Sequence, residues 1–171
     1  MKTIQASCNL YNHLKFSGNS IAMPTQNTKY QLLPGYLIRR VNQLLVAQFF
    51  EETIKQNITP VQWAALCATQ ASPGLDQITL SREIALDTST VAGVIDRLEL
   101  RGFILRKPSS LDKRVKLLFI TKKGLTLLNK TSPKVIELQD WLLSPLSANE
   151  KKVFLKSLHK IIDRGESNTS D

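Results

Sequence analysis

The stretch from residue 75 to residue 121, LDQITLSREIALDTSTVAGVIDRLELRGFILRKPSSLDKRVKLLFIT, decides the fold. Its first part, residues 78–86, has the length and apolar spacing of a short helix, in which we expect Ile84 and Ala85 to face inward. A second helical pattern begins after a polar turn and stops at Gly102. Two helices joined by a turn of about three to four residues form a helix-turn-helix, which this stretch predicts.

The second helix of this pair carries its own start signal. Asp87, Thr88 and Ser89 place side-chain oxygens where the first turn of a helix needs hydrogen-bond acceptors. The apolar residues that follow recur at one-turn spacing and mark one buried face: Val91, Val94, Ile95 and Leu98.

A two-stranded wing is predicted directly after this helix. Residues 103–106 and 115–120 read as strands, and residues 107–113 between them read as a polar loop. The sequence therefore predicts a winged helix-turn-helix.

Long helical patterns flank this unit on both sides. Residues 36–56 carry apolar side chains at near-helical spacing, and Thr59 followed by Pro60 is a helix start. Thr121 begins another long pattern, in which we expect Pro133 to cause a bend or a break.

The last helix is predicted from Ser147, which forms a capping box with Glu150. The fold class is thus mainly α with a small β wing, a winged helix-turn-helix joined to a helical dimerisation region. The expected parts are a flexible or loosely docked leader at 1–31, the dimerisation region at 32–58 and 122–165, the winged helix-turn-helix at 59–121 and the polar tail at 166–171.

The composition narrows the class of protein. The 171 residues carry a net charge of +9, which favours a polyanionic partner. No run approaches the roughly 20 apolar residues of a membrane span, and the N-terminus has no signal-peptide pattern. Cys8 and Cys67 lie in unrelated contexts, so we expect no disulfide and a soluble, cytoplasmic protein. Neither cysteine has a metal-ligand partner, and we expect no metal and no cofactor.

Positive charge is concentrated in and after the second helix of the motif. Residues 97–123 hold nine Lys or Arg against Glu99 and Asp112, a net +7 out of the chain's +9. A surface that follows phosphates concentrates charge in this way beside the element that enters a groove. The segment therefore predicts binding to double-stranded DNA, with these candidate contacts: Ser81, Arg82, Thr88, Ser89, Thr90, Gly93, Arg97, Arg106, Lys107, Asp112, Lys113 and Arg114.

Small side chains at the start of the second helix suit contact with base edges. Thr88, Ser89 and Thr90 can donate or accept there, and Gly93 lets the helix approach closely. The alternatives are helix capping for the hydroxyls, a role that can coexist with base contact, and packing against a neighbouring helix for Gly93. Ser81 and Arg82 on the preceding helix are placed to hold phosphates.

The predicted wing has an arginine that a nearby carboxylate can orient. Arg114 suits the negative potential of a narrow minor groove, and Asp112 two residues earlier can hold its guanidinium. The alternative is an exposed turn in which Asp112 serves only the backbone.

Several motifs in order resemble the MarR family. They are T-P-x-Q-W-x-x-L at 59–66, D-R-L-E-x-R-G at 96–102, D-x-R at 112–114 and T-x-x-G at 121–124. The resemblance covers roughly residues 32–165. It implies an obligate homodimer joined by its first and last helices, which binds pseudo-palindromic operators. The segment LPGYLIRRVNQ at 33–43 further resembles members that sense aromatic carboxylic acids.

A small-molecule site is expected where, by this resemblance, the first, second and fifth helices approach the DNA-binding lobe. The candidates that could bind a carboxylate and an aromatic ring are Tyr36, Arg39, Arg40, Gln43 and Trp63. The alternatives are that Trp63 belongs to the core and that one of the two adjacent arginines forms a salt bridge elsewhere.

The sequence thus predicts a homodimeric repressor that a small aromatic acid releases from its operator. Three other functions are the alternatives. His13 and His159 stand alone and no catalytic motif surrounds them, so we expect no enzyme. A redox-responsive regulator would act through Cys8 or Cys67, of which Cys67 lies in a buried pattern that favours an inert thiol. The third alternative is a DNA-binding protein that responds to no ligand.

Overall fold

The computed structural model describes residues 30–167, and its contacts divide the chain after Arg40. Residues 30–40 belong to one unit and residues 41–167 to the other. Predictions for the leader, including Cys8 and His13, fall almost wholly outside the described residues. The helix α2 (Pro34–Thr53) begins in the first unit and ends in the second.

The first unit holds a 3-10 helix, η1 (Tyr30–Leu32), and the start of α2. The rings of Tyr30 and Tyr36 meet edge to face with centroids 5.2 Å apart. The guanidinium of Arg39 lies 5.1 Å from the centroid of the Tyr36 ring, a distance typical of a cation–π contact.

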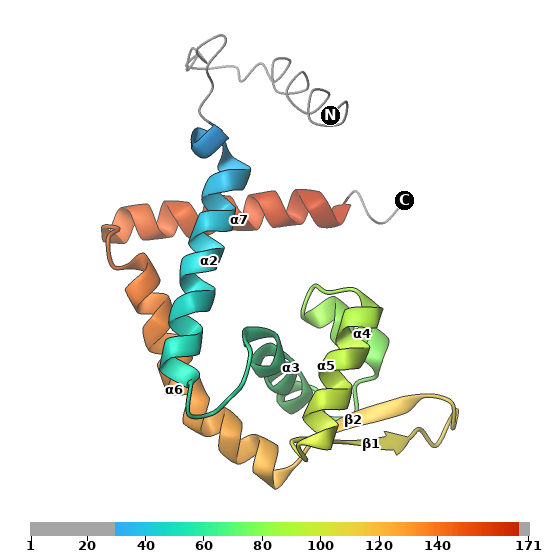
Figure 1. The fold of residues 1–171 in the computed structure, drawn as a ribbon. Coiled ribbons are helices and arrows are strands. Elements are labelled where there is room, and N and C mark those ends of the chain that lie inside the picture. The colour runs from blue at the N-terminus through green and yellow to red at the C-terminus, as the bar shows by residue number, and fades with distance from the viewer. Residues whose placement is uncertain (1–29, 168–171) are drawn as a thin grey trace. The chain divides into compact units, whose positions relative to one another are not determined.

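The second unit contains the predicted winged helix-turn-helix (Figure 1). Its elements follow one another in the chain as α3 (Pro60–Ala71), α4 (Gln77–Glu83), α5 (Thr88–Leu100), β1 (Ile104–Pro108) and β2 (Lys116–Ile120). Capping places the start of each helix. Thr59 and Gln62 form a full capping box at α3, and Asp76 accepts from the Thr79 N–H of α4 at 2.8 Å.

The two strands form an antiparallel wing with a fixed register. Ile104 pairs with Ile120 and Arg106 with Leu118. The loop before α4 also bonds to β2, because Gly74 donates to the Leu118 carbonyl at 2.8 Å and Leu118 donates to that of Leu75 at 2.9 Å. The wing is therefore attached to the helical part of the lobe through its backbone.

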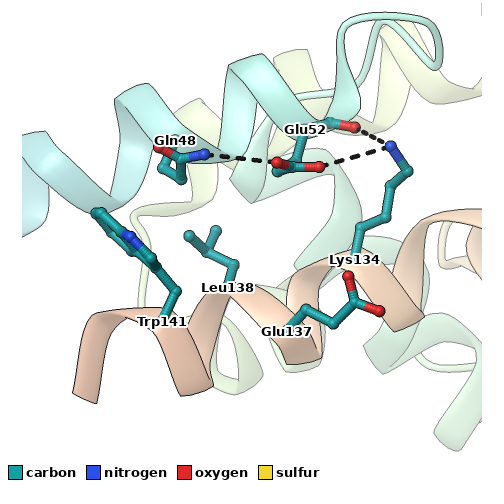
Figure 2. A pocket seen from close by; sticks show the side chains of 6 residues that line it. All are labelled: Gln48, Glu52, Lys134, Glu137, Leu138 and Trp141. Atoms are coloured by element: carbon teal, nitrogen blue, oxygen red, sulfur yellow. Dashed lines mark hydrogen bonds and ion pairs between the residues drawn. The ribbon is translucent and has the colours of Figure 1, made fainter. Parts of the chain in front are cut away.

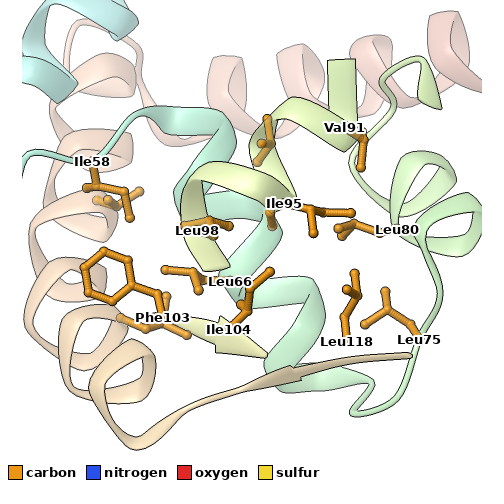
Figure 3. Close-up of a cluster of buried hydrophobic side chains, with 14 of the residues drawn as sticks. Ile58, Leu66, Leu75, Leu80, Val91, Ile95, Leu98, Phe103, Ile104 and Leu118 are labelled. Atoms are coloured by element: carbon orange, nitrogen blue, oxygen red, sulfur yellow. The ribbon is translucent and has the colours of Figure 1, made fainter. Parts of the chain in front are cut away.

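One apolar core holds these elements together (Figure 3). Ala65, Leu66, Val91 and Leu98 have no exposed surface, and burying a leucine contributes about 1.5–3 kcal/mol. The rest of the core is Phe49, Ile58, Leu75, Leu80, Val94, Ile95, Phe103, Ile104, Leu118, Leu128, Val135 and Leu138. The end of α2 and the middle of the next long helix thus share a core with the lobe.

That helix, α6 (Lys122–Leu143), begins where its backbone crosses close to the backbone of Phe103, just before β1. The Thr121 hydroxyl accepts from the Gly124 N–H at 3.0 Å and donates to the Gly102 carbonyl at 2.7 Å. A Cβ on Gly124 would stand 2.1 Å from the Phe103 carbonyl oxygen, so no other residue fits there without movement. The T-x-x-G motif is explained by this contact.

The last helix, α7 (Ala148–Ser167), exposes large apolar side chains and buries none of residues 148–165. Its start is the predicted capping box, in which the Ser147 N–H donates to the Glu150 carboxylate at 2.8 Å. The exposed apolar residues are Val153, Phe154, Leu155, Ile161 and Ile162. Within residues 30–167 none of the helices is long and apolar enough to cross a membrane.

Three local expectations are wrong in whole or in part. Ala85 is exposed in a left-handed conformation, φ +52°, because α4 has already ended and the chain turns there. Of the bend or break expected at Pro133, the break is absent, because α6 runs through that residue without interruption. The polar tail begins later than expected, since α7 continues to Ser167, and residues 168–171 lie outside the described part.

Candidate nucleic-acid interface

A carboxylate organises the start of α5. Asp87 is the N-cap, and its two oxygens accept from the Thr90 N–H at 2.8 Å, the Ser89 hydroxyl at 2.5 Å and the Thr90 hydroxyl at 2.6 Å. These bonds, the hydroxyl of Ser89 first, hold the pKa of Asp87 far below its usual range. Because both hydroxyl protons point to Asp87, Ser89 and Thr90 offer lone pairs outward and are set to accept hydrogen bonds.

The surface of α5 near this end is open. Thr88, Ser89 and Thr90 are exposed. The three atoms nearest to a Cβ on Gly93 would all belong to the Arg97 guanidinium, at 3.6 Å or more. The alternative that Gly93 serves helix packing therefore has no support. Arg97 is itself exposed on this surface.

The two candidates on α4 differ in their placement. Arg82 is exposed, so its charge is available to a polyanion. Ser81 is buried, and its hydroxyl donates to the Ile78 carbonyl at 2.7 Å. Because its proton is committed and its side chain faces the core, Ser81 is a poor phosphate ligand in this conformation. We leave it out of the proposed interface.

The wing tip holds one arginine in a fixed orientation. The Arg114 Nε donates to both oxygens of Asp112, at 3.1 and 3.2 Å, and Nη2 donates to Oδ2 at 2.9 Å. The same carboxylate accepts from the Arg114 N–H at 2.9 Å. The guanidinium lowers the pKa of Asp112, while the Arg114 side chain stays 91% exposed. Asp112 thus serves both the backbone turn and the guanidinium.

The other wing cations have different surroundings. Arg106 pairs with Asp96 and Glu99 of α5, and its N–H donates to the Glu99 carboxylate at 3.1 Å. Its charge joins the wing to the helix, which argues against direct contact with DNA. Lys107 lies over the Phe119 ring at 5.1 Å, and both Lys107 and Lys113 are exposed.

Two residues of this region were not among the candidates. Leu111, at the wing tip, is 97% exposed, and its N–H donates to the Ser109 hydroxyl at 3.2 Å. Arg101, at the end of α5, bonds to backbone carbonyls of the segment after α2. Leu111 could have been found from the sequence, because it is an apolar residue in an otherwise polar wing loop. No local pattern indicates the contacts of Arg101.

The five candidates for a small-molecule site fall in both units. Tyr36, Arg39 and Arg40 belong to the first unit, where Arg39 stacks on Tyr36. Gln43 and Trp63 belong to the second. Trp63 is half-buried, packs against the core and donates from Nε1 to the Ser132 hydroxyl at 3.4 Å. The core role that was the alternative for Trp63 is thus present, and it leaves part of the ring accessible.

A separate pocket of about 140 Å³ lies between α2 and α6 (Figure 2) and contains none of these five residues. Its lining is Gln48, Glu52, Lys134, Glu137, Leu138 and Trp141. The Lys134 ammonium donates to the Glu52 carbonyl at 2.7 Å and lies 3.7 Å from the Glu52 carboxylate. With its one cation engaged and two carboxylates in its wall, this pocket disfavours a carboxylate ligand.

The thiol of Cys67 has surroundings that oppose a redox role. Cys67 is half-buried, and this burial raises the pKa of its thiol. A raised pKa lowers the fraction of reactive thiolate. The structure of this site therefore favours the inert thiol.

Comparison with known proteins places this architecture in a family. The model of the MarR family matches residues 58–116. The transcriptional repressor NicR of Pseudomonas putida is 28% identical over 145 residues, 84% of this chain and 92% of NicR. The PcaV transcriptional regulator of Streptomyces coelicolor, in complex with its natural ligand, is 31% identical, with a TM-score of 0.74 over 80% of this chain and 96% of PcaV.

Two further solved structures share the fold. BpsR of Bordetella bronchiseptica, whose DNA binding is regulated by 6-hydroxynicotinic acid, is 26% identical, with a TM-score of 0.75 over 78% of this chain and 96% of BpsR. A mutant MarR from E. coli, complexed with operator DNA, is 26% identical, with a TM-score of 0.73 over 79% of this chain and 98% of that one. These relatives are regulators of transcription and not enzymes. This chain belongs to the MarR family and is a DNA-binding transcriptional regulator.

Proposed function

We propose that two copies of this chain bind a pseudo-palindromic operator and repress transcription until a small aromatic acid releases them. The observation that carries this proposal is the pairing of an open α5 start with an oriented, exposed Arg114 on one rigid lobe. In this proposal residues 59–121 form the DNA-binding lobe, and residues 32–58 and 122–165 form the dimerisation region.

Unpartnered apolar surface supports the homodimer. Leu37, Ile38, Val41 and Leu44 of α2 are 40% or more exposed, and so are four of the five exposed apolar residues of α7. Water-exposed apolar area of this extent is typical of an interface, and a second copy of the same chain offers a matching surface. Sedimentation tests this directly, because a folded monomer at micromolar concentration contradicts the proposal.

The lobe suits two grooves of the same duplex. We place the start of α5 in the major groove, where Ser89 and Thr90 accept hydrogen bonds from base amino groups and Gly93 allows close approach. The wing then reaches the minor groove with Arg114, and Arg82, Arg97, Lys107 and Lys113 lie toward phosphates. In a dimer the two α5 helices would read half-sites about 10 base pairs apart.

Ligand release is supported by the relatives and by the kinds of side chain present, since guanidinium, phenol, amide and indole groups can bind an aromatic acid. BpsR responds to an aromatic carboxylic acid, and PcaV has a natural ligand. Here the ligand would use Arg39 or Arg40 for its carboxylate and Tyr36, Gln43 and Trp63 for its ring and hydroxyl groups. A ligand that favours a spacing of the α5 helices that DNA does not match weakens binding about 5- to 150-fold.

The test is selection of bound fragments from the source genome, followed by footprinting and titration with a panel of aromatic acids. A discrete protected site with two related half-sites supports the operator-specific dimer, whereas uniform protection contradicts it. Release by a panel member at or below millimolar concentration supports ligand control. If no member binds the DNA-free protein in calorimetry, the aromatic-acid part of the proposal is wrong.

A further inference from the structure

The guanidinium of Arg101 joins the end of α5 to the end of α2. Its Nη1 donates to the Asn57 carbonyl at 2.6 Å, and its Nη2 donates to the Gln56 carbonyl at 3.2 Å. Arg101 is the C-cap residue of α5, while Gln56 and Asn57 form the turn that follows α2. One side chain thus bridges residues 44 and 45 positions apart in the chain.

The receiving turn is shaped for a cation. Asn57 has a left-handed conformation, φ 49°, and its N–H donates back to the Thr53 carbonyl at 3.1 Å. The Gln56 and Asn57 carbonyls lie in the turn beyond the end of α2, and each is a hydrogen-bond acceptor that needs a partner. A planar guanidinium with two parallel N–H groups meets two adjacent carbonyls better than a single ammonium does.

Arg101 is held from its own side as well. Its guanidinium lies 4.7 Å from the centroid of the Phe103 ring, and the Lys123 ammonium lies 5.2 Å from the same centroid. Lys123 also donates to the Arg101 carbonyl at 2.8 Å. The bridge therefore has a fixed base on α5 and the start of α6, and a fixed end on the turn after α2.

We infer that Arg101 is a positioning residue that fixes the angle of α5 against the end of α2 and thereby sets the half-site spacing that the dimer accepts. This inference rests on the proposed function, in which α2 belongs to the dimer frame and α5 reads DNA. A small change in the angle between α5 and the end of α2 would cause a larger change in the distance between the two α5 helices of a dimer. Loss of the bridge should then relax spacing more than it weakens contact with a single half-site.

The core alone does not define this angle as tightly. Leu98 and Ile58 are buried in the shared core and hold the two segments together, but apolar contacts are non-directional. The Arg101 hydrogen bonds are directional and reach only the partly exposed turn. We therefore expect their removal to leave the core intact and to define the angle between α5 and the end of α2 less tightly.

The experiment compares Arg101→Met with Lys122→Met on operators of altered spacing. Both variants remove one positive charge, but only Arg101 contacts the turn after α2, whereas Lys122 is exposed at the start of α6. Affinity is measured for the selected operator and for versions with one base pair added or removed between half-sites. The readout is the spacing ratio, which is the affinity for the selected operator divided by the affinity for an operator of altered spacing. A loss of charge or stability that weakens binding to all operators equally does not change this ratio.

We expect the parent and Lys122→Met to share one spacing ratio and Arg101→Met to lower it by about threefold or more. Arg101→Lys should give an intermediate ratio, because an ammonium can reach one carbonyl. An unchanged ratio in Arg101→Met overturns the inference, and if that variant does not fold, an unchanged ratio in Arg101→Lys does so. A parent without spacing preference contradicts the proposed function instead.

Discussion

Arg114 folds back on Asp112, two residues earlier, and keeps its guanidinium almost fully exposed while three hydrogen bonds orient it. A long side chain normally loses rotamer freedom when it binds, and here that freedom is already restricted before DNA arrives. The wing is thus arranged to deliver its cation at small entropic cost.

We expect Arg114→Ala to weaken operator binding by about ten- to a hundredfold and to leave thermal stability unchanged. The dependence of log K on log salt should become shallower by up to about one unit, since one cation is lost. Lys130→Ala removes an exposed charge on α6 and serves as the control. Equal affinity of Arg114→Ala and the parent at matched salt would falsify the wing assignment.

Leu111 should contribute to DNA binding through apolar contact and not through charge. At the wing tip beside Arg114, an apolar side chain can pack against sugars or wedge at a base step of the minor groove. We expect Leu111→Ala to lower affinity several-fold with no change in the salt slope. Leu100, 89% exposed at the end of α5, is the matched control. A changed slope, or equal losses in both variants, contradicts the assignment.

Gly124→Ala tests the crossing of α6 over the segment before β1. The added Cβ overlaps the Phe103 carbonyl, so we expect unfolding in urea to show a loss of about 1–3 kcal/mol or more. Gly165→Ala, where nothing lies within 4 Å, should be neutral or slightly stabilising because alanine favours a helix. Similar stability of the two variants would show that the crossing is looser than described.

The cap of α5 predicts a dependence on pH. The pKa of Asp87 is depressed in the folded state, so its stabilisation is complete above the unfolded pKa of about 3.9 and is lost as the pH falls below it. Asp87→Ala should therefore destabilise the protein near neutral pH, with a difference from the parent that shrinks in acid. Asp140→Ala, at an exposed site on α6, is the control. A difference independent of pH refutes the role of the charge.

Arg40→Ala tests the ligand proposal. We expect it to abolish release by an aromatic acid while operator affinity in the absence of ligand stays at the parental level, because the guanidinium would meet a carboxylate and not a phosphate. Lys55→Ala removes an exposed charge from the segment after α2 and is the control. Unchanged ligand binding in the Arg40 variant contradicts the residue assignment alone.

Local signals in the sequence predict the lobe well. The caps at Thr59, Asp87 and Thr121 are all present, because each depends on residues within three positions along the chain. The Ser147–Glu150 capping box is confirmed for the same reason.

The sequence is a poorer guide where distant residues decide the surroundings of a side chain. Ser81 and Arg106 suit phosphates by type, yet the core takes the first and two carboxylates of α5 take the second. Neither periodicity nor spacing contains the pairing of Arg101 with the turn after α2, since that contact exists only once the chain has folded. The pocket between α2 and α6 depends on tertiary packing in the same way.

The last helix has no buried side chain among residues 148–165 and must find its apolar contacts in another molecule under the proposed assembly. Most of the stability of a helix in a protein comes from packing of its apolar face and not from the propensity of its residues. Folding of α7 would then be coupled to association of two subunits. Dilution, which dissociates the dimer, should therefore unfold α7 before the other helices. Amide hydrogen exchange in α7 would accordingly become slower as the protein concentration rises. A newly made chain would keep its C-terminal helix unfolded until it bound a second copy.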